Sequence, residues 1–280
     1  MREVNVDLIR DAVRNLSIES NYFLGADIKE ALQRSREKET WKLAAEVLDK
    51  IIINSEIANN EEMPMCQDTG MACVFLEIGQ EVHFVGGLLE DAINEGVRRG
   101  YEEGYLRKSV VKDPIDRVNT KDNTPALIYY DIVEGDKVKI TLAPKGFGSE
   151  NMSRIGMLKP ADGLQGVKDF ILETVKLAGP NPCPPMVIGV GIGGSFDKAA
   201  YLAKKALIRS VDTKNQNKFY SDLEQELLEK INKLGIGPQG FGGRTTALGL
   251  NIETYPTHIA GLPVAVNVNC HATRHKDIIL

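Results

Sequence analysis

The chain has 280 residues, of which 42% are hydrophobic and 26% are charged, and its formal net charge is -5. This balance is typical of a globular protein with a sizeable core, in one large domain or two small ones. An acidic chain is a poor partner for nucleic acid, since phosphate-binding surfaces carry a basic excess. The sequence opens without a signal-peptide layout and has no apolar run that could cross a bilayer, so we expect a cytoplasmic protein without a membrane partner.

Hydrophobic periodicity predicts the first elements. Residues 4 to about 60 read as helical, because apolar residues such as Val6, Ile9 and Val13 recur at helical spacing. The apolar run 72–78 then predicts a strand. Residues 126–133 and 137–142 are rich in β-formers and flank Glu-Gly-Asp, which predicts a β-hairpin.

Further patterns follow along the chain. Amphipathic spacing predicts helices at residues 86–104, 162–177, 195–208 and 218–234. Short apolar runs predict strands at residues 186–188, 245–252 and 262–268. The predicted class is mixed α/β (α+β). We expect one catalytic domain, 1–280, with a helical portion at about 1–60 and an α/β portion at about 61–280 that carries the binding loops.

A glycine-rich segment, Gly189-Val-Gly-Ile-Gly-Gly194, matches the G-x-G-x-x-G pattern of dinucleotide sites and precedes a predicted helix. The apolar segment before it is only three residues long, and no second βαβ half follows, so a dinucleotide enzyme is the weaker hypothesis. Backbone N–H groups at a helix start can hold other anions. The pattern leaves open whether this segment binds an anion or is only a turn.

The four cysteines divide into two kinds. Cys73 lies within an apolar run and is predicted to be core. Cys66, Cys183 and Cys270 lie in polar or proline-rich segments typical of loops, and a cytosolic chain should not use them in disulfides. Three separated thiolates favour a cluster with one open iron over structural zinc, which prefers close ligand pairs. Zinc and thiol catalysis remain alternatives.

Five segments resemble the alpha subunit of class I, iron–sulfur fumarate hydratases, in order and from about residue 10 to the C-terminus. They are Cys-Gln-Asp-Thr-Gly at 66–70, Lys-Gly-Phe-Gly-Ser-Glu-Asn-Met-Ser at 145–153, Asn-Pro-Cys-Pro-Pro at 181–185, Gly-Ile-Gly-Pro-Gln-Gly at 235–240 and Asn-Cys-His-Ala-Thr-Arg-His-Lys at 269–276. The resemblance implies a 4Fe–4S cluster held by Cys66, Cys183 and Cys270, with one open iron that meets the substrate. It implies substrate contacts from Gln67, Asp68, Arg107, Gly146, Gly148 and His258, with Asp68 as the candidate catalytic acid–base group.

The resemblance also implies a function. We expect the alpha subunit of an oxygen-sensitive hydro-lyase that hydrates fumarate reversibly to (S)-malate in the tricarboxylic acid cycle. Tartrate dehydratase and mesaconase alpha subunits are the alternatives; the segments at 148–153 and 271–275 are more fumarase-like. A non-catalytic iron–sulfur scaffold or sensor is an alternative of another class. Single-chain members carry a further C-terminal domain, so a separate beta subunit, in an α2β2 assembly, is the expected partner.

Several of these residues have a simpler interpretation. Asp68 could merely cap the turn before Gly70, an ordinary role for aspartate. Arg107 could be a solvated surface cation, and the basic residues at 271–276 could be a solvated tail. His83, in a strand-like run, is expected to be structural.

Overall fold

A computed structural model describes all 280 residues, Met1–Leu280. Their contacts divide the chain into two compact units. Unit 1 comprises Met1–Gly25, Asn54–Phe147 and Arg274–Leu280, and unit 2 comprises Ala26–Ile53 and Gly148–Thr273. Both units contain helices and a sheet, which confirms the predicted mixed α/β class. A single catalytic domain stays a prediction. No helix combines the length and the apolar character that a membrane span requires.

Unit 1 is built on a four-stranded sheet in the order β10-β5-β2-β4. Its strands are β2 (Met71–Gly79), β4 (Leu127–Val133), β5 (Val138–Lys145) and β10 (Lys276–Ile279). β2 pairs in parallel with β4 and antiparallel with β5. A second, two-stranded sheet pairs β1 (Arg2–Asn5) in parallel with β3 (Val82–Val85), which carries His83 with its side chain exposed.

The predicted hairpin at residues 126–142 is wrong in its pairing, although both of its strands exist. β2 lies between them, and the turn after β4 crosses the end of β2. Gln80 N donates to Val133 O at 2.8 Å, and Gly79 N donates to Lys137 O at 2.8 Å. β2 is apolar and buried along most of its length, which suits a central strand. The local sequence pattern predicts the two strands, but it cannot predict that a third strand is inserted between them.

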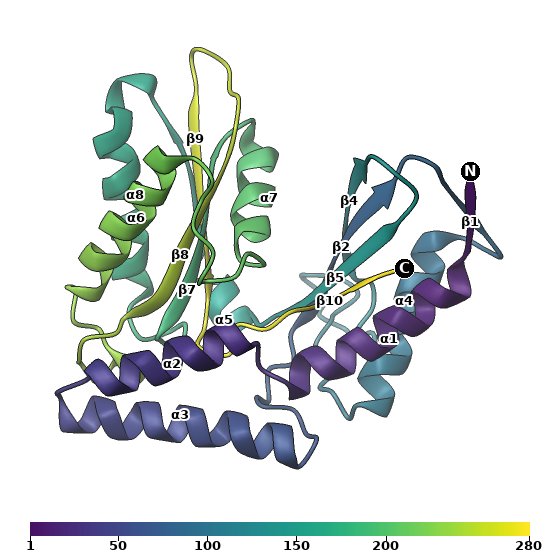
Figure 1. The fold of residues 1–280 in the computed structure, drawn as a ribbon, viewed down its shortest axis with the longest axis horizontal. Helices are drawn as coiled ribbons and strands as arrows, with labels where there is room; N and C mark the ends of the chain where they lie inside the picture. Colours follow the sequence, from purple (N-terminus) through teal and green to yellow (C-terminus); the bar gives the residue numbers. More distant parts are fainter. The chain divides into compact units, whose positions relative to one another are not determined.

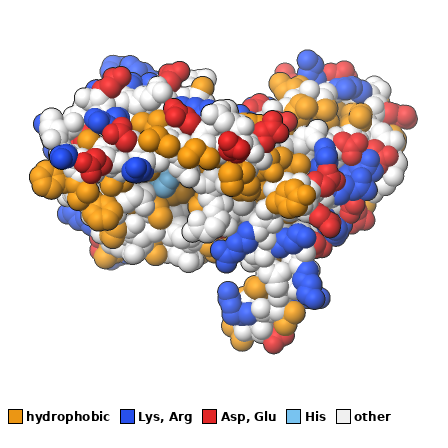
Figure 2. Space-filling view, turned by 90° about the horizontal axis from the view of Figure 1, so that it is seen from below, with side chains coloured by type: hydrophobic (Ala, Val, Ile, Leu, Met, Phe, Trp, Pro, Cys, Tyr) orange, Lys and Arg blue, Asp and Glu red, His pale blue; other side chains and the backbone are white.

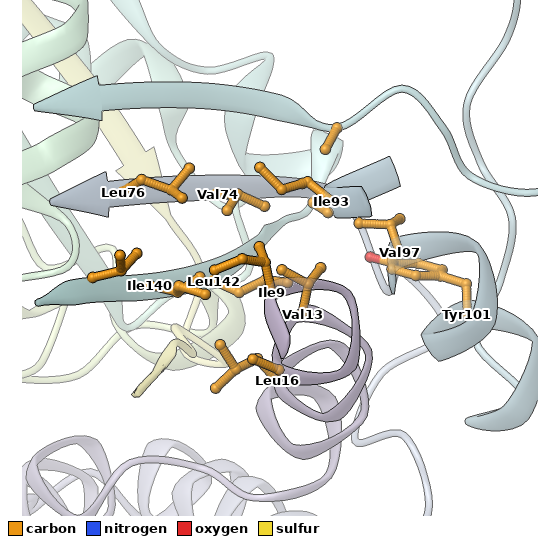
Figure 3. Packing of buried hydrophobic residues seen from close by; sticks show 14 of the residues in the cluster. Ile9, Val13, Leu16, Val74, Leu76, Ile93, Val97, Tyr101, Ile140 and Leu142 are labelled. Carbon is orange, nitrogen blue, oxygen red and sulfur yellow. The ribbon is translucent and has the colours of Figure 1, made fainter. Parts of the chain in front are cut away.

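The core of unit 1 packs two helices, α1 (Val6–Tyr22) and α4 (Leu89–Glu103), against each other and the sheet. Figure 3 shows Ile9 and Val13 of α1 beside Leu142 of β5, with Val97 and Tyr101 on α4. Each such side chain, once fully buried, contributes about 1.5–3 kcal/mol. The Asn5 side chain caps α1 by accepting from Asp7 N at 2.8 Å.

Unit 2 is built on a sheet in the order β6-β9-β7-β8. Its strands are β6 (Arg154–Leu158), β7 (Met186–Gly193), β8 (Ala247–Tyr255) and β9 (Leu262–Asn269). β7 is parallel to β8 and antiparallel to β9. Helices α6 (Gly163–Ala178) and α8 (Lys218–Asn232) cover one face of this sheet, and α7 (Phe196–Ala206) covers the other (Figure 1).

The remaining elements complete the predicted helical portion and the connections. Strand β1 precedes three helices, α1, α2 (Ala26–Lys38) and α3 (Lys42–Asn60), where the sequence predicted helix from residue 4 to about 60. α5 (Phe147–Glu150) and the 3-10 helices η1 (Pro160–Asp162) and η2 (Pro238–Gly240) are short. Leu43, Ile53 and Ile57 of α3 stay exposed, and apolar side chains lie among charged ones on the face in Figure 2.

All but the last residue of the glycine-rich segment lie in β7, which extends well beyond the three residues predicted. Alternate residues such as Ile188 and Val190 join the core under α6 and α8, so Gly189 and Gly191 face α7. A Cβ at either glycine would lie 2.1 Å from a carbonyl oxygen of α7. These two glycines therefore let the helix pack directly on the strand, and this close packing accounts for the pattern without a nucleotide.

Candidate functional site

In unit 1 the segment Cys66–Gly70 forms a loop between α3 and β2, and the core holds it in place. The buried Tyr101 hydroxyl donates to Thr69 O at 2.7 Å and lies 3.2 Å from Gly70 O. Burial raises the pKa of Tyr101, against a smaller opposing effect of Arg274, so the hydroxyl keeps its proton and remains a donor. Tyr101 of α4 thus connects the core of unit 1 to this loop.

The end of the loop requires glycine at position 70. Gly70 has a φ of +71°, and a Cβ there would lie 2.6 Å from the carbonyl carbon of Lys145. The Asn123 side chain donates to Gly70 O at 3.1 Å and accepts from Ser109 N at 2.7 Å. Gly70 therefore lies directly against the backbone of Lys145 in β5, and its positive φ is one that residues with a side chain rarely adopt.

The carboxylate of Asp68 accepts two backbone hydrogen bonds. Oδ1 accepts from Gly70 N at 3.1 Å, which is the turn-capping role. Oδ2 accepts from Phe147 N at 2.9 Å, and a Cβ on Gly146 would lie 3.1 Å from the same oxygen. The capping interpretation is therefore confirmed, and the same carboxylate also lies against Gly146, one of the predicted substrate contacts. The structure brings Asp68 and Gly146 together, as a shared site would require.

Arg107 lies close to the same loop through its backbone. Its carbonyl oxygen accepts from the Thr69 hydroxyl at 3.0 Å. Its guanidinium is exposed, as is the Gln67 side chain. In unit 1, Cys66, Gln67 and Asp68 therefore lie next to the backbone of Arg107. The side chains of Gln67 and Arg107 are exposed and so are accessible to a ligand.

In unit 2 the loops of Cys183 and Cys270 meet. Cys183 precedes β7 and Cys270 follows β9, and these strands are antiparallel, with Val187 paired to Asn269. The loops consequently lie at the same end of the sheet. The N–H of His271 donates to Cys183 O at 3.3 Å, and the His271 Nδ1 atom lies 3.0 Å from the same oxygen.

Gln239 of η2 supports this pair of loops. Its backbone N–H donates to Pro184 O at 2.7 Å, and its side-chain amide donates to the same oxygen at 3.0 Å. The amide nitrogen also lies 3.1 Å from Nδ1 of His271. The family-like segment at 235–240 thus has a structural role, since its Gln239 contacts the loops that carry Cys183 and Cys270.

Three polar side chains hold β9 just before Cys270; the sequence patterns predicted a role for none of them, although two of them, Glu150 and Ser153, lie in the family-like segment 145–153. Asn267 Nδ2 donates to Glu150 Oε2 at 2.7 Å and to Ser153 Oγ at 2.8 Å. Glu150 also pairs with Lys204 at 2.6 Å. The available signal was an asparagine inside an otherwise apolar strand, because buried polar groups need partners.

His258 and Gly148 are placed differently. His258 is exposed in the connection between β8 and β9, where its Nδ1 accepts from Ala260 N at 3.2 Å. This connection lies at the opposite end of β9 from Cys270 (Figure 1). Unit 2 therefore does not bring His258 to the cysteine loops. Gly148 is exposed within α5. The roles of both residues stay predictions.

Comparisons with known proteins identify the family. A family model described as fumarate hydratase (Fumerase) matches residues 10–279. The chain belongs to this family. Across 273 residues this fumarase-family chain is 44% identical to a Methanocaldococcus jannaschii protein named "Putative L(+)-tartrate dehydratase subunit alpha", covering 95% of each chain. It is 30% identical over 279 residues to the L(+)-tartrate dehydratase subunit alpha of Escherichia coli O157:H7, covering 98% of this chain and 91% of that protein. It is 31% identical over 277 residues to the same-named protein of Escherichia coli strain UTI89, with the same coverage.

These relatives confirm the expected hydro-lyase family of fumarase and tartrate dehydratase alpha subunits. They do not confirm fumarate as substrate, because their names specify L(+)-tartrate. The predicted order of substrates, with fumarate first and tartrate second, is therefore not supported by the relatives.

The solvent exposure of each cysteine shows whether it is accessible to a cluster. Cys73 is 1% exposed in the core of β2, as predicted, and cannot reach a cofactor. Cys183 is exposed, Cys66 and Cys270 are partly exposed, and no disulfide joins any of the four. Within either unit, no three His, Cys, Asp or Glu side chains gather as a metal site. The donor set, three accessible loop thiols, suits an iron–sulfur cluster.

Proposed function

We propose that the chain is the catalytic alpha subunit of a two-component iron–sulfur hydro-lyase that acts on a four-carbon dicarboxylate. L(+)-tartrate is the first candidate substrate, because the relatives that match almost the whole chain bear that name. Fumarate is the second, favoured by the description of the family model. The observation that carries the proposal is the placement of an oriented carboxylate, Asp68, two residues from an accessible thiol, Cys66.

The proposal assigns a 4Fe–4S cluster to Cys66, Cys183 and Cys270. Its support is the exposure of these three thiols and the burial of Cys73. A cluster held by these three cysteines would leave one iron without a cysteine ligand, and this iron would supply Lewis-acid chemistry to a substrate oxygen.

Asp68 is proposed to move the proton on the substrate carbon. In dehydration, a base takes a proton from the carbon beside one carboxylate, and hydroxide leaves the neighbouring carbon. The N–H groups of Gly70 and Phe147 hold the Asp68 carboxylate in one orientation, which a positioned acid–base group requires. The same group returns the proton when the reaction runs as hydration.

The substrate carboxylates need cations and N–H donors. The exposed guanidinium of Arg107 offers a bidentate grip on one carboxylate. Gln67, the backbone of Gly146 and Gly148, and His258 are further proposed contacts. One clear arginine is few for a dianion, so we propose that a beta subunit supplies the remaining cations. The relatives' designation as alpha subunits supports this partner, and an α2β2 assembly is the proposed form.

The test is anaerobic reconstitution of the iron-loaded chain with its cognate beta subunit, followed by assays with L(+)-tartrate, fumarate, (S)-malate and mesaconate. We expect turnover of L(+)-tartrate above that of the other acids, and negligible turnover by the chain alone. Fumarate turnover above tartrate turnover would restore the order expected from the sequence. An intact cluster with no turnover of any acid would overturn the proposal and favour the non-catalytic scaffold.

A further inference from the structure

Arg274 is buried, with 4% of its surface exposed, on the segment that leads into β10. The solvated-tail interpretation is therefore wrong for this residue. Its Nη2 donates to Asp68 O at 2.6 Å, and its Nε donates to Asn21 Oδ1 at 3.2 Å. The guanidinium thus contacts the backbone of the Cys66–Gly70 loop and a side chain of α1, all within unit 1.

Asn21 fastens the other end of the same loop. It is 1% exposed, its Nδ2 donates to Ser17 O at 2.9 Å, and its backbone carbonyl oxygen accepts from Met65 N at 3.1 Å. Arg274 and Asn21 therefore hold the chain on both sides of Cys66 and Gln67. The Cys66 thiol and the Gln67 amide oxygen, 3.6 Å apart, lie between these two points.

An arginine at position 274 indicates that the side chain serves to direct hydrogen bonds to particular acceptors. A guanidinium keeps its charge at any ordinary pH, and burying a charge is costly unless its N–H groups find acceptors. An apolar side chain could fill the same space at less cost. Arginine instead offers donors in a rigid fork, one of which is used on a loop carbonyl and another on Asn21.

We propose that Arg274 is a positioning residue: it fixes the backbone at Asp68 so that the Cys66 thiol and the Asp68 carboxylate keep their working orientation. The inference rests on the proposed function of this loop. Arg274 follows Cys270 by four residues. The segment that carries one proposed cluster ligand therefore also holds the loop of another. Arg274 itself is too deeply buried to bind substrate.

The experiment compares Arg274→Met and Arg274→Lys with Arg209→Met. Arg209 is a matched control, because it is also a largely buried arginine, paired with Glu224 and Glu253 in unit 2. Four quantities are measured: the alkylation rate of Cys66 relative to Cys183 in cluster-free protein, the iron retained after anaerobic reconstitution, and kcat and KM with the beta subunit.

For Arg274→Met we expect the relative alkylation of Cys66 to rise about fivefold, because a loop released at one end opens more often. Iron retention should fall, and kcat should fall about 10–100-fold with little change in KM, the signature of misplacement rather than of lost substrate binding. Arg274→Lys should recover part of each effect. Arg209→Met should lower the melting temperature and leave Cys66 alkylation unchanged.

The proposal fails if Arg274→Met lowers the melting temperature as the control does while Cys66 alkylation and kcat stay within about twofold of wild type. If Arg274→Met does not fold, Asn21→Ala removes one guanidinium acceptor and is judged by the same readouts. Failure of the proposed function is distinguishable, since wild type would then turn over no acid while the alkylation comparison still decides the role of Arg274.

Discussion

Asp68 and Phe147 are joined by a hydrogen bond in which Asp68 Oδ2 accepts from the Phe147 backbone N–H at 2.9 Å. The bond connects the cysteine loop to the start of α5, while the second carboxylate oxygen caps the turn at Gly70. Two backbone donors therefore orient one acid. From the sequence alone, Asp68 could be explained as a turn cap. In the structure its carboxylate caps the turn at Gly70 and also accepts a hydrogen bond from Phe147, on a second segment.

Replacing Asp68 by Asn tests its chemical role. The amide nearly preserves the shape but removes the base, and its single oxygen can accept from only one of the two backbone N–H groups, so we expect kcat to fall by about 10²–10⁴-fold with the iron content unchanged. Asp113→Asn is the matched control, since the Asp113 carboxylate also accepts two backbone N–H groups, those of Ile115 and Asp116, in an exposed turn. Activity of Asp68→Asn above a tenth of wild type would leave Asp68 with only a structural role.

Serine substitutions test the cluster ligands. Cys66→Ser, Cys183→Ser and Cys270→Ser should each lose most of their bound iron after anaerobic reconstitution, because each removes one of three thiolates. Cys73→Ser is the internal control and should keep its iron, since Cys73 is buried in the core of β2. Iron and acid-labile sulfide per chain are the measurements. Equal losses in all four variants would contradict the assignment.

Tyr101→Phe tests the link between the core and the cysteine loop. The variant keeps the buried ring but leaves the carbonyl of Thr69 without its donor, which should cost about 1–3 kcal/mol in the free energy of unfolding. Denaturant titration at neutral pH measures the change. Tyr255→Phe is the control, since Tyr255 is 54% exposed and the variant should lose little stability. Equal stability of the two variants would show that this hydrogen bond is dispensable.

Much of the fold was predictable because apolar periodicity is a local signal. The helices α4, α6, α7 and α8 and the central strands all follow from it, as does the placement of Cys73 in the core. The cysteine loops were predictable from proline and polar residues. The pairing of the strands was not predictable, because β2 is inserted between β4 and β5 by contacts between residues far apart in the sequence.

The supporting residues of the site were hidden for the same reason. Asn267 and Glu150 are 117 positions apart, and Arg274 and Asp68 are 206 apart. A polar residue in a short C-terminal segment looks solvated when read locally. Only the fold shows that Arg274, on the segment that leads into the edge strand β10, is buried and that its guanidinium meets the backbone carbonyl of Asp68.

Asp122→Asn tests an acid-sensitive contribution to stability next to Asn123, which holds Gly70. Burial opposes ionisation of Asp122, but hydrogen bonds from the Thr124 N–H and hydroxyl and from Arg98 outweigh it and lower its pKa to about 2. An unfolded aspartate titrates near about 3.9, so the stabilisation is present above that pH and is lost as the pH falls through about 2.

At neutral pH we therefore expect Asp122→Asn to lower the free energy of unfolding by about 1–2 kcal/mol. The difference from wild type should shrink between pH 4 and pH 2, which urea titrations over that range would measure. Asp136→Asn, at an exposed position, should show no such trend. A difference that stays constant with pH would mean that lost packing, and not the carboxylate charge, causes the effect.

Gly191→Ala decides between the two explanations of the glycine-rich segment. The added Cβ would lie 2.1 Å from Ala199 O and 2.6 Å from Ala203 N, so α7 must move away from β7. Because both contacts are with backbone, we expect a loss of about 2–3 kcal/mol or more in the free energy of unfolding. Gly261→Ala is the matched control in unit 2, since its Cβ would meet only ordinary contacts of 3.8–3.9 Å. Dinucleotides should bind neither wild type nor variant in calorimetric titrations. A variant of unchanged stability would overturn the packing explanation, and specific NAD binding by wild type would revive the dinucleotide hypothesis that the strand geometry opposes.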